Sequence, residues 1–339
     1  MFTKPDDLAD ETIAVALEQR WRFRPVDLAY QTVGFGSHHW LAASHTGETH
    51  FVSVDDLVKH VSSTPDGTTD AAFVRLARAF RAARALAQDA SLGFVVAPLA
   101  AADGEVLVRL DNRYSMVVHP YLTGAPAGET SEYRSHADRM SVLERIVILH
   151  AATDAATPHA GVERGFLPGR RELTIALDRV DTSWPTAPYG DQARVLLRDN
   201  ADGVQALLAH YDRLAVHVCA DRERMVITHG EPSASNVIID AGGPRLVDWE
   251  SALVAYPERD LWGLDPGDRS VFAAYTEATG VALVEERLDY YRLWYDLFEI
   301  AGYIDLFRNP HRDTADTAES WKNLVDFLQP EERWPALFR

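Results

Sequence analysis

The sequence predicts an α+β fold in which a small antiparallel β lobe, residues 1–120, precedes a larger, mainly helical lobe, residues 121–339. Short apolar runs separated by glycine-containing and polar turns fill most of the first third. Beyond about residue 124, long segments place apolar residues at helical spacing. One stretch of strands, residues 225–250, interrupts these helices. The 339 residues fit two lobes with a cleft between them.

In the first lobe, alternating acidic and apolar residues predict a leading helix, and glycine turns separate the strands that follow it. Alanine and arginine with apolar residues at helical spacing predict a helix that crosses the sheet. In order, the expected elements are a helix at 7–20, strands at 27–33, 41–44 and 50–54, the crossing helix at 70–90, a hairpin at 94–110 around the turn ADGE, and a strand at 114–122.

In the second lobe, leucine and valine recur at helical spacing in several long segments. They predict helices at 132–152, 190–220 and 285–308. Between the last two, the segment MVITHGEPSASNVIIDAGGPRLVDWE reads as strand, loop, strand, a turn at Gly242–Gly243 and a further strand.

Composition excludes some classes of function. With 33 basic and 51 acidic residues the formal charge is −18, which disfavours nucleic acid and is compatible with a cationic or neutral substrate. The single cysteine, Cys219, fits a reducing compartment. The first residues lack a signal pattern and no apolar run is long enough for a membrane helix, so we expect a cytoplasmic protein.

The loop THGEPSASN and the strand after it carry the most informative residues. Glu231 and Asn236 lie five positions apart, and Asp248 ends the next apolar strand. Phosphoryl transfer needs a carboxylate that accepts the proton of the attacking hydroxyl, together with Asn and Asp ligands for Mg²⁺. Glu231 is therefore the candidate base, and Asn236 and Asp248 are the candidate metal ligands.

This segment resembles the catalytic segment of aminoglycoside phosphotransferases, which is typically His-Gly-Asp-x-His-x-x-Asn followed by Asp-[Trp/Phe]-[Glu/Asp]. The order of elements over residues 10–310 resembles the spectinomycin-phosphotransferase-like branch of this kinase-like family. The resemblance implies a bilobal protein-kinase-like fold, Mg²⁺, and ATP or GTP as the phosphoryl donor. It also implies that His229, Ser233 and Asp260 support the catalytic loop.

The same resemblance assigns a nucleotide site to the first lobe. The glycine loop GFGSHHW would approach the phosphates of the nucleotide. The segment 118–121 would act as a hinge between the lobes, and its backbone would face the adenine or guanine ring. Standing alone, the two glycines would favour a tight turn between strands, and it is the catalytic segment further along the chain that favours a nucleotide loop. The implied nucleotide-binding residues are Gly34, Gly36, Ser37, His39, Ser53, Val118, His119 and Tyr121.

Three departures from the family pattern favour a degenerate kinase over an active phosphotransferase. The base is Glu231 rather than Asp, and Ser233 replaces the second His of the motif. The strand that normally carries a phosphate-binding lysine appears to have Ser53 at that position, and residues 61–98 contain no Glu to orient a lysine. The candidate substitutes are Lys59, Arg75, His38 and His39, and the sequence does not decide among them.

Late helices in the family help to line the acceptor site. The resemblance therefore suggests Asp296 and Glu299 on the helix 285–308, with Trp249 and Glu250 beside Asp248, as acceptor-binding residues. A solvated helix face is the plainer interpretation of the first two.

The leading hypothesis is an ATP- or GTP-dependent O-phosphotransferase whose acceptor is a small molecule such as an aminoglycoside or aminocyclitol. One alternative is a degenerate kinase that serves as a nucleotide-binding or interaction subunit. Another is a kinase-like component that phosphorylates a peptide Ser or Thr, which would require a protein or peptide partner.

Overall fold

A computed structural model describes residues 1–128, 130, 132–184, 186–218 and 224–338. Cys219 lies outside the described residues. By contacts, the chain forms two compact units. The first contains Met1, Thr3–Glu163 and Arg222–Leu288, and the second contains Phe2, Arg164–Asp221 and Asp289–Arg339. The first unit thus joins the β-rich region to the THGEPSASN segment, and the lobe boundary at residue 120 stays a prediction.

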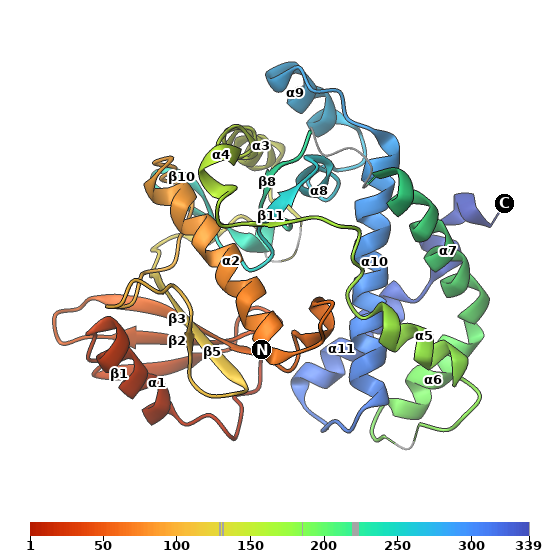
Figure 1. Cartoon of the computed structure of the whole chain (residues 1–339), viewed down its shortest axis with the longest axis horizontal. Helices are drawn as coiled ribbons and strands as arrows, with labels where there is room; N and C mark the ends of the chain where they lie inside the picture. Colours follow the sequence, from red (N-terminus) through yellow and green to blue (C-terminus); the bar gives the residue numbers. More distant parts are fainter. Residues whose placement is uncertain (129, 131, 185, 219–223, 339) are drawn as a thin grey trace. The chain divides into compact units, whose positions relative to one another are not determined.

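The β-rich region is an antiparallel five-stranded sheet with the order β1-β2-β3-β5-β4, as expected for the small lobe (Figure 1). Its strands are β1 (Asp27–Gln31), β2 (His38–Ala43), β3 (Thr49–Asp56), β4 (Val108–Arg109) and β5 (Tyr114–Pro120). The register pairs His39 with Ser53 and Phe51 with His119. Because side chains alternate along a strand, these four residues and Asp55 share one face of the sheet.

The opposite face of this sheet packs on the leading helix, α1 (Asp10–Ala16), which continues as a π-helical turn, η1 (Leu17–Trp21). Ile13 and Leu17 are fully buried against Trp40 and the inward-facing valines of β3 and β5. Trp40 also donates from Nε1 to Asp10 at 2.7 Å. This apolar layer anchors the sheet and leaves its polar face for the site.

The helix α2 (Thr69–Gln88) lies where the sequence predicts a crossing helix. Thr68 caps it by accepting a hydrogen bond from the amide of Ala71. Its buried stripe is rich in alanine, which lets neighbouring segments approach closely. A short 3₁₀ turn, η2 (Val61–Ser63), connects β3 to this helix.

The predicted hairpin at 94–110 is wrong. Residues 94–100 form no strand; instead the amide of Leu246 donates to Phe94, and that of Val96 donates to Leu246. Only β4 pairs with β5 in the sheet. The apolar run is buried because it crosses to the strand before Asp248, a long-range contact that local periodicity does not encode.

The rest of the first unit surrounds two small sheets with the orders β10-β9-β6 and β7-β11-β8. Their strands are β6 (Ala125–Pro126), β7 (Gly161–Val162), β8 (Val226–Thr228), β9 (Val237–Asp240), β10 (Gly243–Leu246) and β11 (Leu253–Ala255). The helices around them are α3 (His136–Ala151), α4 (Thr153–Ala156), η3 (Ala234–Asn236), α8 (Glu258–Leu261) and α9 (Ser270–Thr279).

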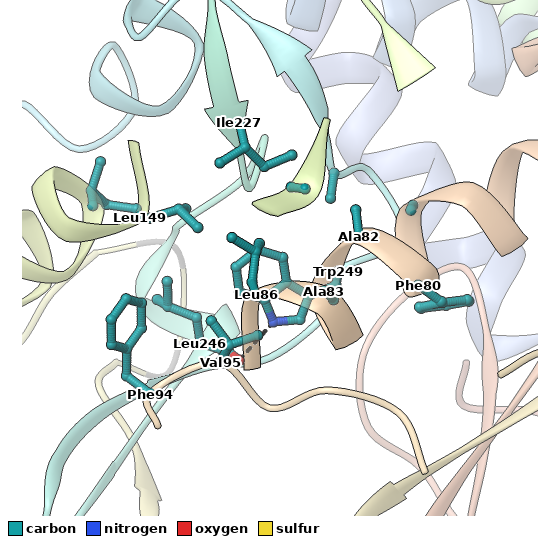
Figure 2. Close-up of a cluster of buried hydrophobic side chains, with 14 of the residues drawn as sticks. Phe80, Ala82, Ala83, Leu86, Phe94, Val95, Leu149, Ile227, Leu246 and Trp249 are labelled. Carbon is teal, nitrogen blue, oxygen red and sulfur yellow. Dashed lines mark hydrogen bonds between the residues drawn. The ribbon is translucent and has the colours of Figure 1, made fainter. Parts of the chain in front are cut away.

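One buried cluster joins α2, α3 and these strands (Figure 2). Leu86 of α2, Leu149 of α3, Ile227 of β8 and Leu246 of β10 meet there, and Trp249 lies in the same cluster with no exposed surface. Truncation of one such leucine to alanine typically costs about 2–5 kcal/mol. The strands that carry the catalytic loop therefore start from a rigid apolar base.

The second unit is helical, and α5, α6 and α7 lie along the long α10 (Figure 1). Its elements are α5 (Arg170–Asp178), α6 (Gly190–Asp199), α7 (Ala201–Val218), α10 (Glu285–Arg308, which begins in the first unit), α11 (Ala315–Phe327), α12 (Pro330–Arg333) and η4 (Pro335–Leu337). The helix predicted at 285–308 is confirmed. The single helix predicted at 190–220 is wrong, because Asn200 ends α6 and its side chain binds the carbonyl of Leu196.

No helix in the described ranges is both long and apolar enough to span a bilayer.

Candidate active site

The loop between β8 and β9 presents Glu231 and Asn236 together. The amide nitrogen of the Asn236 side chain donates to the carbonyl of Glu231 at 3.1 Å. This bond fixes the orientation of the amide, so that Asn236 Oδ1 points away from that contact and remains the atom suited to a cation. Glu231 is exposed, as a group that meets a substrate must be.

Asp248 follows β10 and is tied to the loop through its neighbour, since the amide of Val247 donates to the carbonyl of Asn236. Its backbone is left-handed, with φ of 64°, a conformation that costs energy for a residue with a Cβ. Surrounding protein atoms, then the charges of Glu250 and Glu231, raise the pKa of Asp248 well above its usual range. Its side chain nevertheless keeps access to solvent.

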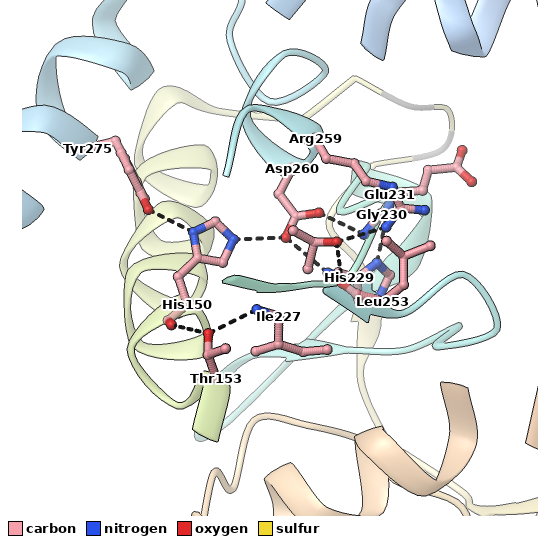
Figure 3. A network of polar contacts seen from close by, with 11 residues as sticks. His150, Thr153, Ile227, His229, Gly230, Glu231, Leu253, Arg259, Asp260 and Tyr275 are labelled. Atoms are coloured by element: carbon pink, nitrogen blue, oxygen red, sulfur yellow. Dashed lines mark hydrogen bonds and ion pairs between the residues drawn. The ribbon is translucent and has the colours of Figure 1, made fainter. Parts of the chain in front are cut away.

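Asp260, on α8, holds the catalytic loop through hydrogen bonds (Figure 3). Its carboxylate accepts from the amides of His229 at 2.9 Å and Gly230 at 2.6 Å, and it lies 3.1 Å from His150 Nε2. His150, on α3, also contacts the hydroxyl of Tyr275 at 2.9 Å. Burial alone would raise the pKa of Asp260, but the hydrogen bond with His150 and the basic groups nearby lower it.

His229 has a tautomer set by its contacts. The amide of Glu231 donates to Nδ1, so Nε2 carries the proton and donates to the carbonyl of Val247 at 2.7 Å. Burial lowers the pKa of His229 and keeps the ring neutral. The ring meets Trp249 edge-on, with centroids 4.6 Å apart. His229 thus joins the loop of the candidate base to the segment that carries Asp248.

Gly230 and Arg259 form a close contact in the same network. Gly230 has φ of 102°, and a Cβ there would lie 2.5 Å from the guanidinium of Arg259. Arg259 is buried and donates to the hydroxyl of Thr228 at 2.8 Å. A glycine is therefore required before the candidate base.

Tyr133 also supports the catalytic loop, and sequence reasoning missed it. Its hydroxyl donates to the carbonyl of Pro232 at 2.5 Å. The side chain of Ser233, at the position of the family's second His, makes one hydrogen bond within the described residues, to the hydroxyl of Ser235. Tyr133 reaches the loop from far along the chain, so no local pattern could have revealed it.

The glycine loop adopts the geometry that a phosphate approach requires. Gly34 and Gly36 have φ of 66° and 112°. A Cβ on Gly34 would also lie 3.2 Å from His39 Nε2. Ser37, at the end of the loop, donates to Asp55 at 2.6 Å. The loop is thus tied directly to β3.

Ser53 and His39 form a cross-strand pair, with His39 Nδ1 3.0 Å from the serine hydroxyl. Burial, then the positive N-terminal amine, lower the pKa of His39 to about 3, so the ring carries no charge at neutral pH. Neither residue supplies the cation that the family lysine would provide. His38 faces the other side and contacts Tyr30.

The hinge residues offer different groups. The carbonyl of Val118 already accepts from the amide of Leu99 at 2.7 Å. His119 has a buried Nε2 that forms no hydrogen bond with any described residue, and burial lowers its pKa to about 4. Tyr121 is exposed.

Asp55, His60, Arg75 and Glu250 gather beside the glycine loop, and the sequence had named only the last two. Arg75 of α2 donates to the carbonyl of Glu250 at 3.1 Å and lies 3.2 Å from His60 Nδ1. His60 Nε2 lies 3.9 Å from Asp55. Burial, then the charge of Glu250, raise the pKa of Asp55 to about 7. Lys59, the other proposed substitute, is exposed.

The four suggested acceptor residues have different surroundings. Trp249 is fully buried and donates to the carbonyl of Leu246, so its side chain presents no surface to a ligand. Asp296, in the second unit, is also buried and accepts from Arg333 and Trp334. Glu299 is bound to Tyr303, and burial raises the pKa of its carboxyl. Glu250 is partly exposed and lies beside Asp248.

These groups fit Mg²⁺. Asn236 and Asp248 offer hard oxygen ligands from two segments joined by a hydrogen bond, and Glu231 and Glu250 add negative charge nearby. Carboxylates crowded in this way are stabilised by a divalent cation, and Mg²⁺ needs few protein oxygens.

Comparison with known proteins agrees with this geometry. Residues 61–303 match the model of the "Phosphotransferase enzyme family". Protein StrN of Streptomyces griseus is 31% identical over 256 residues, covering 73% of this chain and 75% of that protein.

Solved structures share the fold at low identity. Spectinomycin phosphotransferase APH(9)-Ia, solved with ADP and spectinomycin, superposes with a TM-score of 0.70 at 14% identity, covering 96% of this chain and 98% of that one. Amicoumacin kinase, solved with AMP-PNP, Ca²⁺ and Ami, gives 0.56 at 12% identity over 96% and 94%. Choline kinase LicA of Streptococcus pneumoniae gives 0.56 at 13% over 94% and 98%.

The chain therefore has a kinase-like fold and belongs to the aminoglycoside phosphotransferase family, whose members are phosphotransferase enzymes.

Proposed function

We propose that this enzyme transfers the γ-phosphoryl group of ATP or GTP to a hydroxyl of a small, positively charged acceptor of the aminoglycoside or aminocyclitol class. The main support is the placement of Glu231, Asn236 and Asp248: an exposed carboxylate, an amide oriented by a hydrogen bond and a second carboxylate on a connected segment. The nucleotides and the antibiotics bound by the similar spectinomycin and amicoumacin enzymes agree with it.

Glu231 would accept the proton of the acceptor hydroxyl as that oxygen attacks the phosphorus. The hydrogen bond from the Asn236 side chain to the backbone carbonyl of Glu231 fixes the backbone that carries this carboxylate. Asn236 and Asp248 would hold Mg²⁺, which offsets phosphate charge when bound. Asp260 and Tyr133 keep the loop in place. Gly34, Gly36 and Ser37 would contact the phosphates of the nucleotide. The nucleotide's purine base would lie among His39, Ser53 and the hinge residues Val118, His119 and Tyr121.

A cationic acceptor fits the charge around the site. The charges of Glu250 and Glu231 both act on Asp248, and the chain as a whole is strongly acidic. Glu250 would bind an acceptor ammonium, and Glu299 stays a prediction for the same role.

The test is nucleotide turnover with Mg²⁺ and either ATP or GTP across a panel of aminocyclitols and aminoglycosides. Glu231→Gln should lower kcat by about 10²–10⁴-fold while the enzyme still binds nucleotide, because only the base is lost. Glu277→Gln, an exposed glutamate on α9, is the matched control and should keep full activity.

Two outcomes would refute the proposal. Undiminished kcat in both Glu231→Gln and Asp248→Asn would remove the assigned chemistry. Nucleotide binding without turnover on any acceptor in the panel would favour the nucleotide-binding subunit, or a peptide Ser or Thr as the acceptor.

A further inference from the structure

Asp55 is an acid with an unused oxygen inside the protein. It is 1% exposed, and Ser37 donates to its Oδ1 at 2.6 Å. Its Oδ2 is buried and accepts no hydrogen bond from any described residue. The next residue, Asp56, differs, because the guanidinium of Arg113 binds it at 2.6 Å. A buried carboxylate oxygen normally has a partner, so Asp55 requires an explanation.

The residues around Asp55 provide a second oxygen ligand. Single ligand atoms of Asp55, His60 and Glu250 all lie within 4.8 Å of one another. The guanidinium of Arg75 can only donate hydrogen bonds, so Nδ1 of His60 is the acceptor in their contact. The proton of the neutral imidazole therefore lies on Nε2. A protonated nitrogen does not bind a metal. The groups suited to a cation are therefore the two carboxylates, and the imidazole separates Asp55 from Arg75.

Acidic side chains outnumber basic ones in this region. The charges of Glu250, Glu231 and Asp55 all act on Asp248, whereas the basic groups that act here are Arg75, Arg259 and Lys59. The polarity is also the reverse of the lysine on the strand and the glutamate on the helix that the family pattern provides. Here β3 carries the acid and α2 carries the cation.

This reversal has a consequence for phosphate binding. An acid at the end of β3, bound to the glycine loop through Ser37, would repel a nucleotide phosphate that approached it directly. A divalent cation between the carboxylate and the phosphate would reverse the sign of this interaction. Oxygen-only ligands favour Mg²⁺ or Mn²⁺ over Zn²⁺.

We propose that Asp55 and Glu250 bind a divalent cation, separate from the one assigned to Asn236 and Asp248, that supplies the positive charge the family lysine provides elsewhere. Its role toward phosphate rests on the proposed nucleotide-dependent function. Arg75 acts as a positioning residue that holds the Glu250 backbone and keeps His60 from serving as a ligand.

The experiment measures binding of Mn²⁺ alone to the full chain, by electron paramagnetic resonance titration of free Mn²⁺, so it needs neither nucleotide nor turnover. Asp55→Asn should bind one fewer Mn²⁺ per chain, or bind it about tenfold or more weakly, because a ligand is lost. Asp66→Asn, an exposed acid in the loop before α2, is the control and should match the wild type. Asp248→Asn should retain the site at Asp55.

His60→Asn tests the ligand set and should bind Mn²⁺ as well as the wild type. Glu250→Gln is the second probe if Asp55→Asn does not fold, which circular dichroism would reveal, and it should show the same loss. Wild-type Mn²⁺ binding in Asp55→Asn, or a loss in His60→Asn equal to that in Asp55→Asn, would overturn the proposal. Absence of turnover with intact Mn²⁺ binding would count against the proposed function alone.

Discussion

Asp260→Asn should destabilise the first unit and displace the catalytic loop. The substitution keeps shape and removes one acceptor oxygen. The remaining oxygen is best placed where Oδ2 lies, because that atom serves both His229 and His150, and the new amide then faces the amide of Gly230. A buried donor that loses its acceptor costs about 1–3 kcal/mol, and two charge-assisted bonds become neutral, about 1 kcal/mol each. Part of this cost is offset, because the neutral amide does not have to keep a charge buried as the carboxylate does.

The expected net loss is about 2–3 kcal/mol in the free energy of unfolding at pH 7, measured by urea denaturation with tryptophan fluorescence. Asp260→Ala should cost more, about 4 kcal/mol, because all three donors lose their acceptor. Asp66→Asn is the matched exposed control and should stay within about 0.5 kcal/mol of the wild type.

The pH dependence of this term has a definite sign. The folded-state pKa of Asp260 lies below its ordinary value of 3.8, so its contribution is present above that pH and is lost as the pH falls through the folded pKa. Asp260→Asn should lack this acid-dependent term. A loss below about 0.5 kcal/mol for Asp260→Asn, or equal losses for Asn and Ala, would refute the assignment of Asp260 as the acceptor that holds the loop.

Three further predictions each concern a single residue. Gly230→Ala should lower kcat more than it lowers the melting temperature, because the new Cβ would displace the guanidinium of Arg259 beside the catalytic loop; an unchanged kcat would contradict the close contact. Tyr133→Phe should cost about 1 kcal/mol in urea denaturation and lower kcat, since the carbonyl of Pro232 loses its donor; equal kcat in the two proteins would show that the loop does not need this bond. His119, whose folded pKa of about 4 lies below 6.5, should make stability fall as the pH drops from 6.5 toward 4, by up to about 1.4 kcal/mol per pH unit, because only the unfolded state takes up the proton. His119→Phe should flatten that profile, and identical profiles would show that the ring is not buried in the folded state.

Sequence reasoning located the catalytic segment because its residues are close along the chain. Glu231 and Asn236 share one loop, and Asp248 follows one hairpin later, so spacing alone brought them together. The same held for α10, whose predicted and observed bounds coincide. By contrast, the run at 94–100 was misread as a strand, because its partner, Leu246, lies far along the chain.

The residues that hold the catalytic loop in place also differ in how far the sequence revealed them. The motif named Asp260 and His229, but Tyr133 and Tyr275 had no local signal, since each contributes one hydroxyl from a distant element. Asp55 had no local signal either, because its buried oxygen, unpaired among the described residues, and its proximity to His60 and Glu250 exist only in the folded chain.

The sequence by itself determined the family, the α+β layout and the three residues proposed to perform the chemistry, because local spacing and residue type encode them. Tertiary structure decided the electrostatics. Whether Ser53 and Asp55 share a face with His39, whether Trp249 is surface or core, and whether His60 can bind a metal depend on strand register, burial and hydrogen bonding. Charges interact through space. Only the folded chain therefore brings the carboxyl of Asp55, on β3, close to Ser37 of the glycine loop and to Glu250.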